Sequence, residues 1–289
     1  MPGLQRALRS LDGLSVGDAF GERFFAEPTA IEQRRLPAAP WRWTDDTAMA
    51  LGIVRTLAEH GKLDRDALAA NFAAQYLAQP DRGYGRGAHA VLSSIARGSR
   101  WQDAAIQLFG GEGSRGNGAA MRVAPLGAFF ADDLDRAASE AQNSAVVTHA
   151  HAEAIAGAMA VAVCAALMAR TVDGASWLGA RALLAAVTGY VPAGAVRSAI
   201  SRTVALPDGY SSVQAASELG SGQRLLALDT VPFALWVAVH YQHNYEEALW
   251  ATVEGGGDMD TTCAIVGGLV SLVADVPGDW LAAREPLPA

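Results

Sequence analysis

Two short acidic segments contain the residues best suited to chemistry. In residues 43–47, Asp45 and Asp46 are adjacent, stand between Thr44 and Thr47, and precede an apolar run. Adjacent side chains point in different directions, so the two carboxylates can contact two ions, or one ion and one water. Oxygen ligands of this kind suit Mg²⁺, Ca²⁺ or Mn²⁺ rather than zinc. The alternative is a solvated helix cap, which explains one aspartate easily and two less well.

The second acidic segment is residues 255–262, where three glycines precede Asp258, Asp260 and Thr261. The glycines allow backbone conformations closed to other residues and let a ligand approach closely. Side chains two positions apart do not share a helix face, but in a loop that enters a helix they can converge on one point. An EF-hand is excluded, because the loop glycine and distal glutamate of that motif do not follow.

Both acidic segments stand at the predicted N-terminus of an apolar helix. A helix N-terminus repels cations, so several carboxylates must outweigh the helix dipole before a metal binds. Four aspartates carry a formal charge of −4, which is the right scale for two divalent cations. Without cations, four clustered carboxylates would be strongly destabilising. We therefore expect a binuclear metal site.

Two further segments are weaker candidates. Residues 113–122 form a glycine-rich loop whose backbone N–H groups can cradle a phosphate, but no Gly-Lys-Ser/Thr follows, so the loop is not a P-loop. On its own this segment is more simply a plain turn. His149 and His151 would face different ways in a helix, so we do not expect them to share a zinc ion.

The elements that position these residues are predicted to be helices. Thr44 begins one that stops before Gly61, and Asp64 caps another that Pro80 ends. The other predicted helices cover residues 85–96, 134–148, 151–170, 177–188, 244–254 and 260–274. No long alternation of apolar and polar residues requires a sheet, and neither a repeat nor a low-complexity linker divides the chain. We expect one compact all-α domain over residues 1–289.

Composition limits the classes of partner. The chain has 289 residues, of which 51% are hydrophobic and 18% charged, which excludes a largely disordered protein. The net charge is −8 and the arginines are scattered, so duplex nucleic acid is not an expected partner. Two cysteines make no disulfide framework, and the start lacks the features of a signal peptide. The longest apolar run, residues 154–169, is shorter than the roughly 20 residues that span a bilayer. We expect a cytoplasmic protein without a membrane partner.

Taken in order, the motifs resemble the ADP-ribosylglycohydrolase family, which includes dinitrogenase reductase-activating glycohydrolase and the ADP-ribosyl-acceptor hydrolases. The resemblance lies in residues 14–21, 43–49, 116–125, 148–149 and 256–261, and so extends over nearly the whole chain. Each motif is weak alone, whereas five in order with family-like spacing are a strong indication.

The resemblance implies an all-α orthogonal fold with two Mg²⁺ ions, sometimes Mn²⁺, in a cleft. It implies hydrolysis of the C1″ bond that joins ADP-ribose to a protein or small-molecule acceptor, through an oxocarbenium-like transition state. The implied metal ligands are Thr44, Asp45, Asp46, Asp258, Asp260 and Thr261. The implied catalytic residues are Asp45, Asp46 and Asp260, with Asp46 or Asp260 accepting the proton of the attacking water. The implied substrate-binding residues are Ser114, Gly116, Asn117, Gly118, Met121, His149, Gly256 and Gly257.

One position departs from the family. Members usually carry a glutamate four residues after the glycine that ends the Gly-Asp-x-x-Gly segment, and here that position is Phe25. Glu22 and Glu27 flank it out of register. Either one of them substitutes through a shifted loop, or the chain is a catalytically altered, ADP-ribose-binding or structural member of the same scaffold.

Two other all-α classes fit less well. An isoprenoid synthase needs a third acid in Asp-Asp-x-x-Asp, where this chain has Met49, and several basic residues for diphosphate, whereas Lys62 is the one lysine here. Histidine-aspartate phosphohydrolases need a His-Asp dipeptide, which the sequence lacks.

Overall fold

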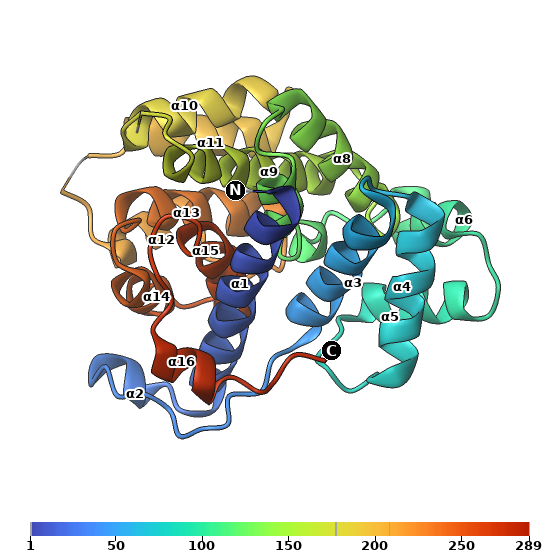
Figure 1. Ribbon diagram of the computed structural model, residues 1–289, viewed down its shortest axis with the longest axis horizontal. Coiled ribbons are helices and arrows are strands. Elements are labelled where there is room, and N and C mark those ends of the chain that lie inside the picture. Colours follow the sequence, from blue (N-terminus) through green and yellow to red (C-terminus); the bar gives the residue numbers. More distant parts are fainter. Residues whose placement is uncertain (1, 177, 208, 289) are drawn as a thin grey trace.

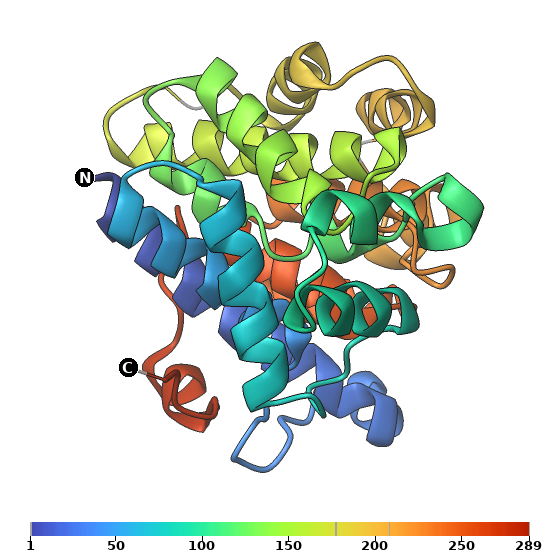
Figure 2. The same ribbon diagram turned by 90° about the vertical axis from the view of Figure 1, so that its right-hand side faces the viewer.

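A computed structural model describes residues 2–176, 178–207 and 209–288, and its regular structure is helical (Figure 1). Within these ranges there are sixteen α-helices and two short 3-10 helices, and no strand. The predicted all-α class is confirmed. In both views α8 to α11 lie at the top, α2 and α16 lie at the bottom, and α1 and α15 run between them (Figures 1 and 2).

The helices, in chain order, are α1 (Gly3–Ala26), α2 (Thr29–Glu32), α3 (Asp45–His60), α4 (Arg65–Ala78), α5 (Arg86–Ala96), α6 (Trp101–Ile106), η1 (Leu108–Gly111), η2 (Asn117–Ala119), α7 (Ala124–Phe129), α8 (Leu134–Val146), α9 (Ala152–Val172), α10 (Ala180–Tyr190), α11 (Ala195–Ala205), α12 (Ser212–Leu219), α13 (Ala227–His240), α14 (Tyr245–Glu254), α15 (Met259–Val270) and α16 (Gly278–Ala283).

Helices α1 and α15 pack closely against each other. This contact places the first motif of the chain beside the second acidic segment. Three glycines of α1, four residues apart, face the backbone of α15. A Cβ atom at Gly17 would lie 2.1 Å from the carbonyl oxygen of Cys263, and one at Gly21 would lie 2.3 Å from that of Met259. Only glycine permits this approach, which brings the middle of α1 against the first turns of α15.

Helix α9 is a buried core helix. It has 21 residues, a mean hydropathy of 2.0 over its most apolar window, and 78% of that window buried inside the molecule. The helix is therefore longer than the 16-residue apolar run in the sequence suggests, and by length and composition it could cross a membrane. Here it packs against α7, α8, α10 and α13.

Most predicted helix boundaries agree with the structure to within a few residues. Thr44 and Asp64 lie at the N-caps of α3 and α4, and Gly61 ends α3 with a left-handed φ of 64°. Helix α15 ends at Val270, four residues earlier than predicted, where the chain turns. Helix α10 begins at Ala180, and the predicted start at Trp177 lies outside the described residues.

Candidate functional site

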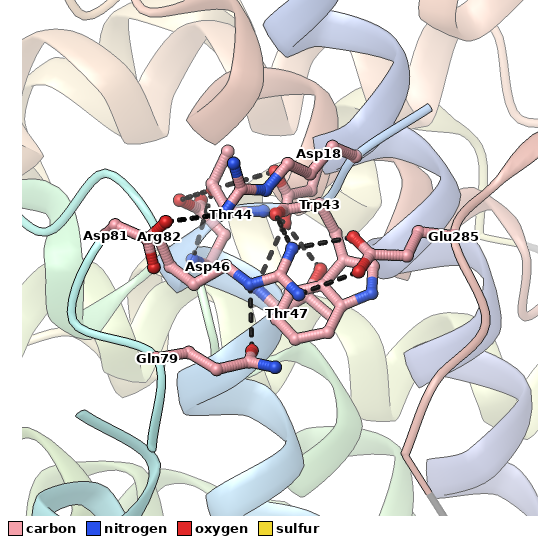
Figure 3. Close-up of polar contacts among 10 residues, drawn as sticks. Asp18, Trp43, Thr44, Asp46, Thr47, Gln79, Asp81, Arg82 and Glu285 are labelled. Carbon is pink, nitrogen blue, oxygen red and sulfur yellow. Dashed lines mark hydrogen bonds and ion pairs between the residues drawn. The ribbon is translucent and has the colours of Figure 1, made fainter. Parts of the chain in front are cut away.

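The N-terminus of α3 is fixed by a buried carboxylate of α1 (Figure 3). Asp18 is fully buried and accepts hydrogen bonds from the backbone N–H groups of Thr44 (2.9 Å) and Thr47 (3.1 Å). It also accepts from the hydroxyls of Thr44 (2.8 Å) and Thr47. The Thr44 hydroxyl is the side-chain cap of α3 and accepts from the Asp46 N–H at 3.4 Å. Asp18 and Thr44 together therefore serve the N-terminus of α3, and capping does not require the carboxylates of Asp45 and Asp46.

A second clamp holds the loop before α3 (Figure 3). The Arg82 guanidinium lies 3.4 Å from the centre of the Trp43 ring and donates to the Trp43 carbonyl at 2.9 Å. Glu285 accepts two hydrogen bonds from Arg82, at 2.6 and 2.8 Å. The Arg82 carbonyl in turn accepts from the Asp45 N–H at 2.7 Å. The loop is thus tied to the C-terminal segment of the chain.

The N-terminus of α15 presents its carboxylates differently. Gly257 has a φ of 79°, and a Cβ there would lie 2.1 Å from the Ser221 carbonyl oxygen, so glycine is required. The next N–H, of Asp258, donates to that carbonyl at 2.9 Å. The Asp258 side chain makes no capping bond to α15. Instead it accepts a 2.6 Å hydrogen bond from Nδ2 of Asn117.

The two acidic N-termini lie within each other's electrostatic reach. Burial, followed by repulsion from Asp18 and Asp260, raises the pKa of both Asp45 and Asp46 well above its usual range. Burial raises the pKa of Asp258 to about 7, with a further increase from Asp260. It raises the pKa of Asp260 to about 6, with a contribution from Asp18. A group of carboxylates this destabilised favours a bound cation or proton.

Two carboxylate oxygens support a cation in particular. Oδ1 of Asp46 and Oδ1 of Asp260 are buried and have no hydrogen-bond partner among the described residues. Buried acceptors are nearly always satisfied, and oxygen donors of this type suit Mg²⁺ or Mn²⁺. The donor chemistry therefore fits the predicted metal. Across the described ranges, however, no three His, Cys, Asp or Glu side chains already form a group that could hold a metal ion.

The glycine-rich loop lies beside Asp258. Asn117 is buried; its N–H donates to the Leu225 carbonyl at 3.1 Å and its Nδ2 to the Thr230 hydroxyl at 3.0 Å. Ser114 Oγ accepts from the Gly116 N–H at 3.1 Å. The His149 ring packs over the loop: Cβ atoms at Gly116 and Gly118 would lie 3.4 and 3.1 Å from its Nε2.

The other residues predicted to bind substrate or metal are Met121, Gly256, Gly257 and Thr261. Met121 is buried with its methyl group near Gly118. Gly256 has a φ of 64°, and a Cβ there would meet nothing within 4 Å, whereas Gly257 is closely packed. Thr261 is buried, and its hydrogen bond opposes the rise in the pKa of Asp258.

His151 has a different position from His149. It is the N-cap of α9, where its Nδ1 accepts from the Glu153 N–H at 3.1 Å. Two surface hollows, of about 290 Å³ near His243 and about 230 Å³ near Arg136, also lie elsewhere on the chain. Neither hollow is lined by any of the four aspartates.

The structure distinguishes the two glutamates that flank Phe25. Glu22 is half-buried, and burial raises its pKa, with a contribution from repulsion by Asp258. Glu27 forms ion pairs with Arg23 (3.6 Å) and Arg35 (3.3 Å). Phe25 itself is 48% exposed. Of the two acids, Glu22 is therefore the one that shares the electrostatic field of the aspartates.

Sequence reasoning did not select Asp18 as a site residue, although it lies in the first motif. The signal was a lone aspartate among small and apolar residues, between Gly17 and Ala19. It also missed Arg82 and Glu285, which are 203 positions apart and meet only in the folded chain.

Comparisons with known proteins identify the family of the chain. The family model for ADP-ribosylglycohydrolase matches residues 2–286. An uncharacterized protein of Archaeoglobus fulgidus is 30% identical over 285 residues, covering 93% of this chain and 88% of that protein. The human ADP-ribosylhydrolase ARH3 is 29% identical over 82% of this chain and 73% of its own. The ADP-ribosylarginine hydrolase Tri1 of Pseudomonas putida is 28% identical over 96% of this chain and 74% of its own length.

A solved structure supports the same conclusion. It is described as an ADP-ribosylglycohydrolase-related protein complex, has 27% sequence identity and a TM-score of 0.67, and covers 98% of this chain and 93% of its own. The family model alone extends over nearly all of the sequence. The chain belongs to the ADP-ribosylglycohydrolase family.

Proposed function

We propose that this protein hydrolyses the C1″ glycosidic bond of an ADP-ribosylated protein or small molecule and releases ADP-ribose. The observation that carries the proposal is the meeting of two acidic helix N-termini, with buried oxygens of Asp46 and Asp260 left without partners. The relatives named as ADP-ribosylhydrolase and ADP-ribosylarginine hydrolase support the substrate class.

We further propose that the site takes two divalent cations, Mg²⁺ or Mn²⁺. The residues that would hold them are Thr44, Asp45, Asp46, Asp258, Asp260 and Thr261. Such cations orient ribose hydroxyls and lower the pKa of a bound water. The support is the donor chemistry and the raised pKa values of the aspartates, since a net excess of buried negative charge is otherwise costly.

The chain's own residues have distinct roles in this proposal. Asp46 or Asp260 accepts the proton of the attacking water, because each has a buried oxygen without a hydrogen-bond partner among the described residues and a pKa that burial raises above its usual range. The loop at Gly116, Asn117 and Gly118 binds the diphosphate and ribose. Asn117 links this loop to the acidic residues, because its side-chain amide donates a hydrogen bond to Asp258.

The test is turnover of a substrate panel. Wild-type protein is incubated with ADP-ribosyl-arginine and ADP-ribosyl-serine peptides and with small-molecule conjugates, with Mg²⁺ or with a chelator. We expect release of ADP-ribose from at least one substrate and loss of release on chelation. Release that is indifferent to chelation would overturn the metal proposal and leave the hydrolase proposal standing.

A second candidate is a binding member without turnover, which the apolar Phe25 favours. It predicts calorimetric binding of ADP-ribose with no release from any substrate in the panel. The variant Phe25→Glu is then informative. Gain of hydrolysis would show that this one side chain silences a complete site, whereas no gain would show that the loop itself has diverged.

A further inference from the structure

Arg122 is a buried cation that no carboxylate neutralises by direct contact. Its exposed fraction is 0%, and the hydrogen bonds it makes among the described residues all go to uncharged groups. It donates to the Ser144 carbonyl at 3.0 Å and to the Thr148 hydroxyl at 2.9 Å, and its guanidinium carbon lies 4.5 Å from the Phe72 ring centre. Burying a charge in this way is costly, which calls for a role beyond packing.

The contact with Thr148 fixes the direction of the next hydrogen bond. An arginine can only donate, so the Thr148 oxygen is an acceptor in that pair. Thr148 is itself 2% exposed, and its own proton needs an acceptor. Nδ1 of His149 lies 2.8 Å from the hydroxyl oxygen. If Nδ1 carried a proton, two donors would converge on Thr148 and its hydroxyl proton would be left without a partner.

Nδ1 of His149 is therefore the acceptor, and in a neutral ring the proton is on Nε2. That nitrogen is at the ring edge over the loop, where Cβ atoms at Gly116 and Gly118 would lie 3.4 and 3.1 Å away. Among the described residues Nε2 has no hydrogen-bond partner, and His149 remains 9% exposed. An N–H group thus faces a loop kept clear of side chains.

We propose that Arg122 and Thr148 are positioning residues that fix His149 as the neutral Nε2–H tautomer, so that it presents one donor to an acceptor oxygen of a ligand bound over the Gly116–Gly118 loop. The identity of that ligand as ADP-ribose rests on the proposed function; the tautomer does not.

Charge and burial act in the same direction as the hydrogen bonds. Burial, with a smaller contribution from the Arg122 charge, lowers the pKa of His149 to about 3, so the ring is neutral at physiological pH. Burial also lowers the pKa of Arg122 to about 9, which leaves the guanidinium charged there. A neutral imidazole with an Nε2 proton donates to a ligand oxygen without carrying a positive charge of its own.

The tautomer is tested by nitrogen NMR on the full chain labelled with ¹⁵N-histidine. The His149 resonances are assigned by their loss in His149→Gln. We expect Nδ1 to give the downfield resonance of an unprotonated nitrogen and Nε2 that of a protonated one. An Nδ1–H tautomer or an imidazolium at neutral pH would overturn the proposal. This result needs no ligand and is independent of whether the protein is a hydrolase.

The positioning role of Thr148 is tested by a matched pair of variants. Thr148→Val keeps the shape and removes the hydroxyl, so the Nδ1 resonance should shift toward a mixture of tautomers. Thr148→Ser keeps the hydroxyl and should restore the wild-type spectrum. Unchanged resonances in Thr148→Val would show that Thr148 does not set the tautomer. If Thr148→Val does not fold, Thr148→Ala replaces it.

Binding provides the functional measurement. Calorimetric titration with ADP-ribose should be about three- to tenfold weaker for Thr148→Val, the effect of weakening one neutral hydrogen bond, and close to wild type for Thr148→Ser. Equal affinity in Thr148→Val and wild type would contradict the positioning role. If wild type binds no ADP-ribose, the proposed function fails while the NMR result still decides the tautomer.

Discussion

Helices α4 and α15 both begin with an aspartate at the N-cap, and the two carboxylates behave in opposite ways. Asp64 accepts from the N–H groups of Asp66 and Ala67, each at 3.0 Å, and the bond from Ala67 is the main cause of its lowered pKa. Asp258 makes no such bond, contacts Asn117 at 2.6 Å, and has a pKa that burial raises to about 7. One aspartate caps the N–H groups of its helix, and the other makes no capping bond to its helix.

The N-terminus of α3 shows how carboxylates are released from capping. There the cap is Thr44, and the buried Asp18 accepts from the first turn. Asp45 and Asp46 then have raised rather than lowered pKa values. The position of an acid at a helix N-terminus therefore does not determine its role: at α3, Thr44 and Asp18 accept from the N-terminal N–H groups, and the two acids that follow Thr44 are not needed as caps.

The largest expected effect is a difference in activity between two variants, each of which replaces one N-cap aspartate by asparagine. Asp258→Asn removes a charge from the proposed metal site and should lower kcat/KM at least about 100-fold. Asp64→Asn keeps a good cap on a helix remote from the site and should leave the rate near wild type. Steady-state turnover of both variants checks this. Equal losses would show that the two positions do not differ in role.

The α1–α15 contact can be broken directly. Gly17→Ala places a Cβ 2.1 Å from a backbone oxygen of α15, so the free energy of unfolding should fall by about 2–3 kcal/mol. Gly189→Ala, on the exposed face of α10 with nothing within 4 Å, should raise it by about 0.5–1 kcal/mol. Urea unfolding of both variants measures the difference. A mild effect at Gly17 would mean that the helices separate without cost.

Metal binding should stabilise the fold more at high pH. Asp258 has an ordinary pKa of 3.8 and a folded-state pKa of about 7, so the metal-free folded protein holds extra protons between these values. In the metal-free protein, the contribution of Asp258 to the free energy of unfolding therefore falls as pH rises from about 4 to about 7. Mg²⁺ needs the ionised form, so the shift in Tm from Mg²⁺ should be larger at pH 8 than at pH 5.

At saturation near 100 times Kd the stabilisation by Mg²⁺ should reach about 2.7 kcal/mol per site. The control is NaCl at equal ionic strength, which should give no such shift. A Tm that does not respond to millimolar Mg²⁺ at pH 8, or responds more at pH 5, would contradict the metal site.

The smallest effect separates the glutamates beside Phe25. Glu22 shares the field of Asp258, so Glu22→Gln should lower the rate about tenfold, the low end for groups that support the ligands of a metal site. Glu27 is in surface ion pairs, so Glu27→Gln should stay within about 0.5 kcal/mol in stability and near wild type in rate. Full activity in both variants would mean that catalysis depends on the aspartates without a replacing glutamate.

Local chemistry explains which parts of the fold were predictable. The start of α3 at Thr44 and its end at Gly61 depend on caps that are visible in a few residues. Helix α1 was not predicted, because Gly13, Gly17 and Gly21 disfavour a helix locally and are needed only for contact with α15. Helix α13 was missed as well, since it contains Pro232 and begins without a polar cap.

In the candidate site, too, some residues could be selected from local sequence and others could not. Asp45, Asp46, Asp258 and Asp260 were selected by residue type and spacing, and the structure brings them into electrostatic contact; their roles stay predictions. The roles of Asp18 and Thr148 depend on partners 26 or more positions away, such as Thr44 and Arg122, so no short pattern reveals them.

The central claim is that Asp45, Asp46, Asp258 and Asp260 hold two divalent cations, and calorimetric titration with Mg²⁺ tests it most directly. Wild type should bind two ions, and Asp260→Asn, which removes one formal charge and replaces one carboxylate oxygen by an NH₂ group that cannot bind a cation, should bind at most one at comparable affinity. Asp64→Asn should bind two. Two ions bound to Asp260→Asn with unchanged affinity, or none bound to wild type, would contradict the account.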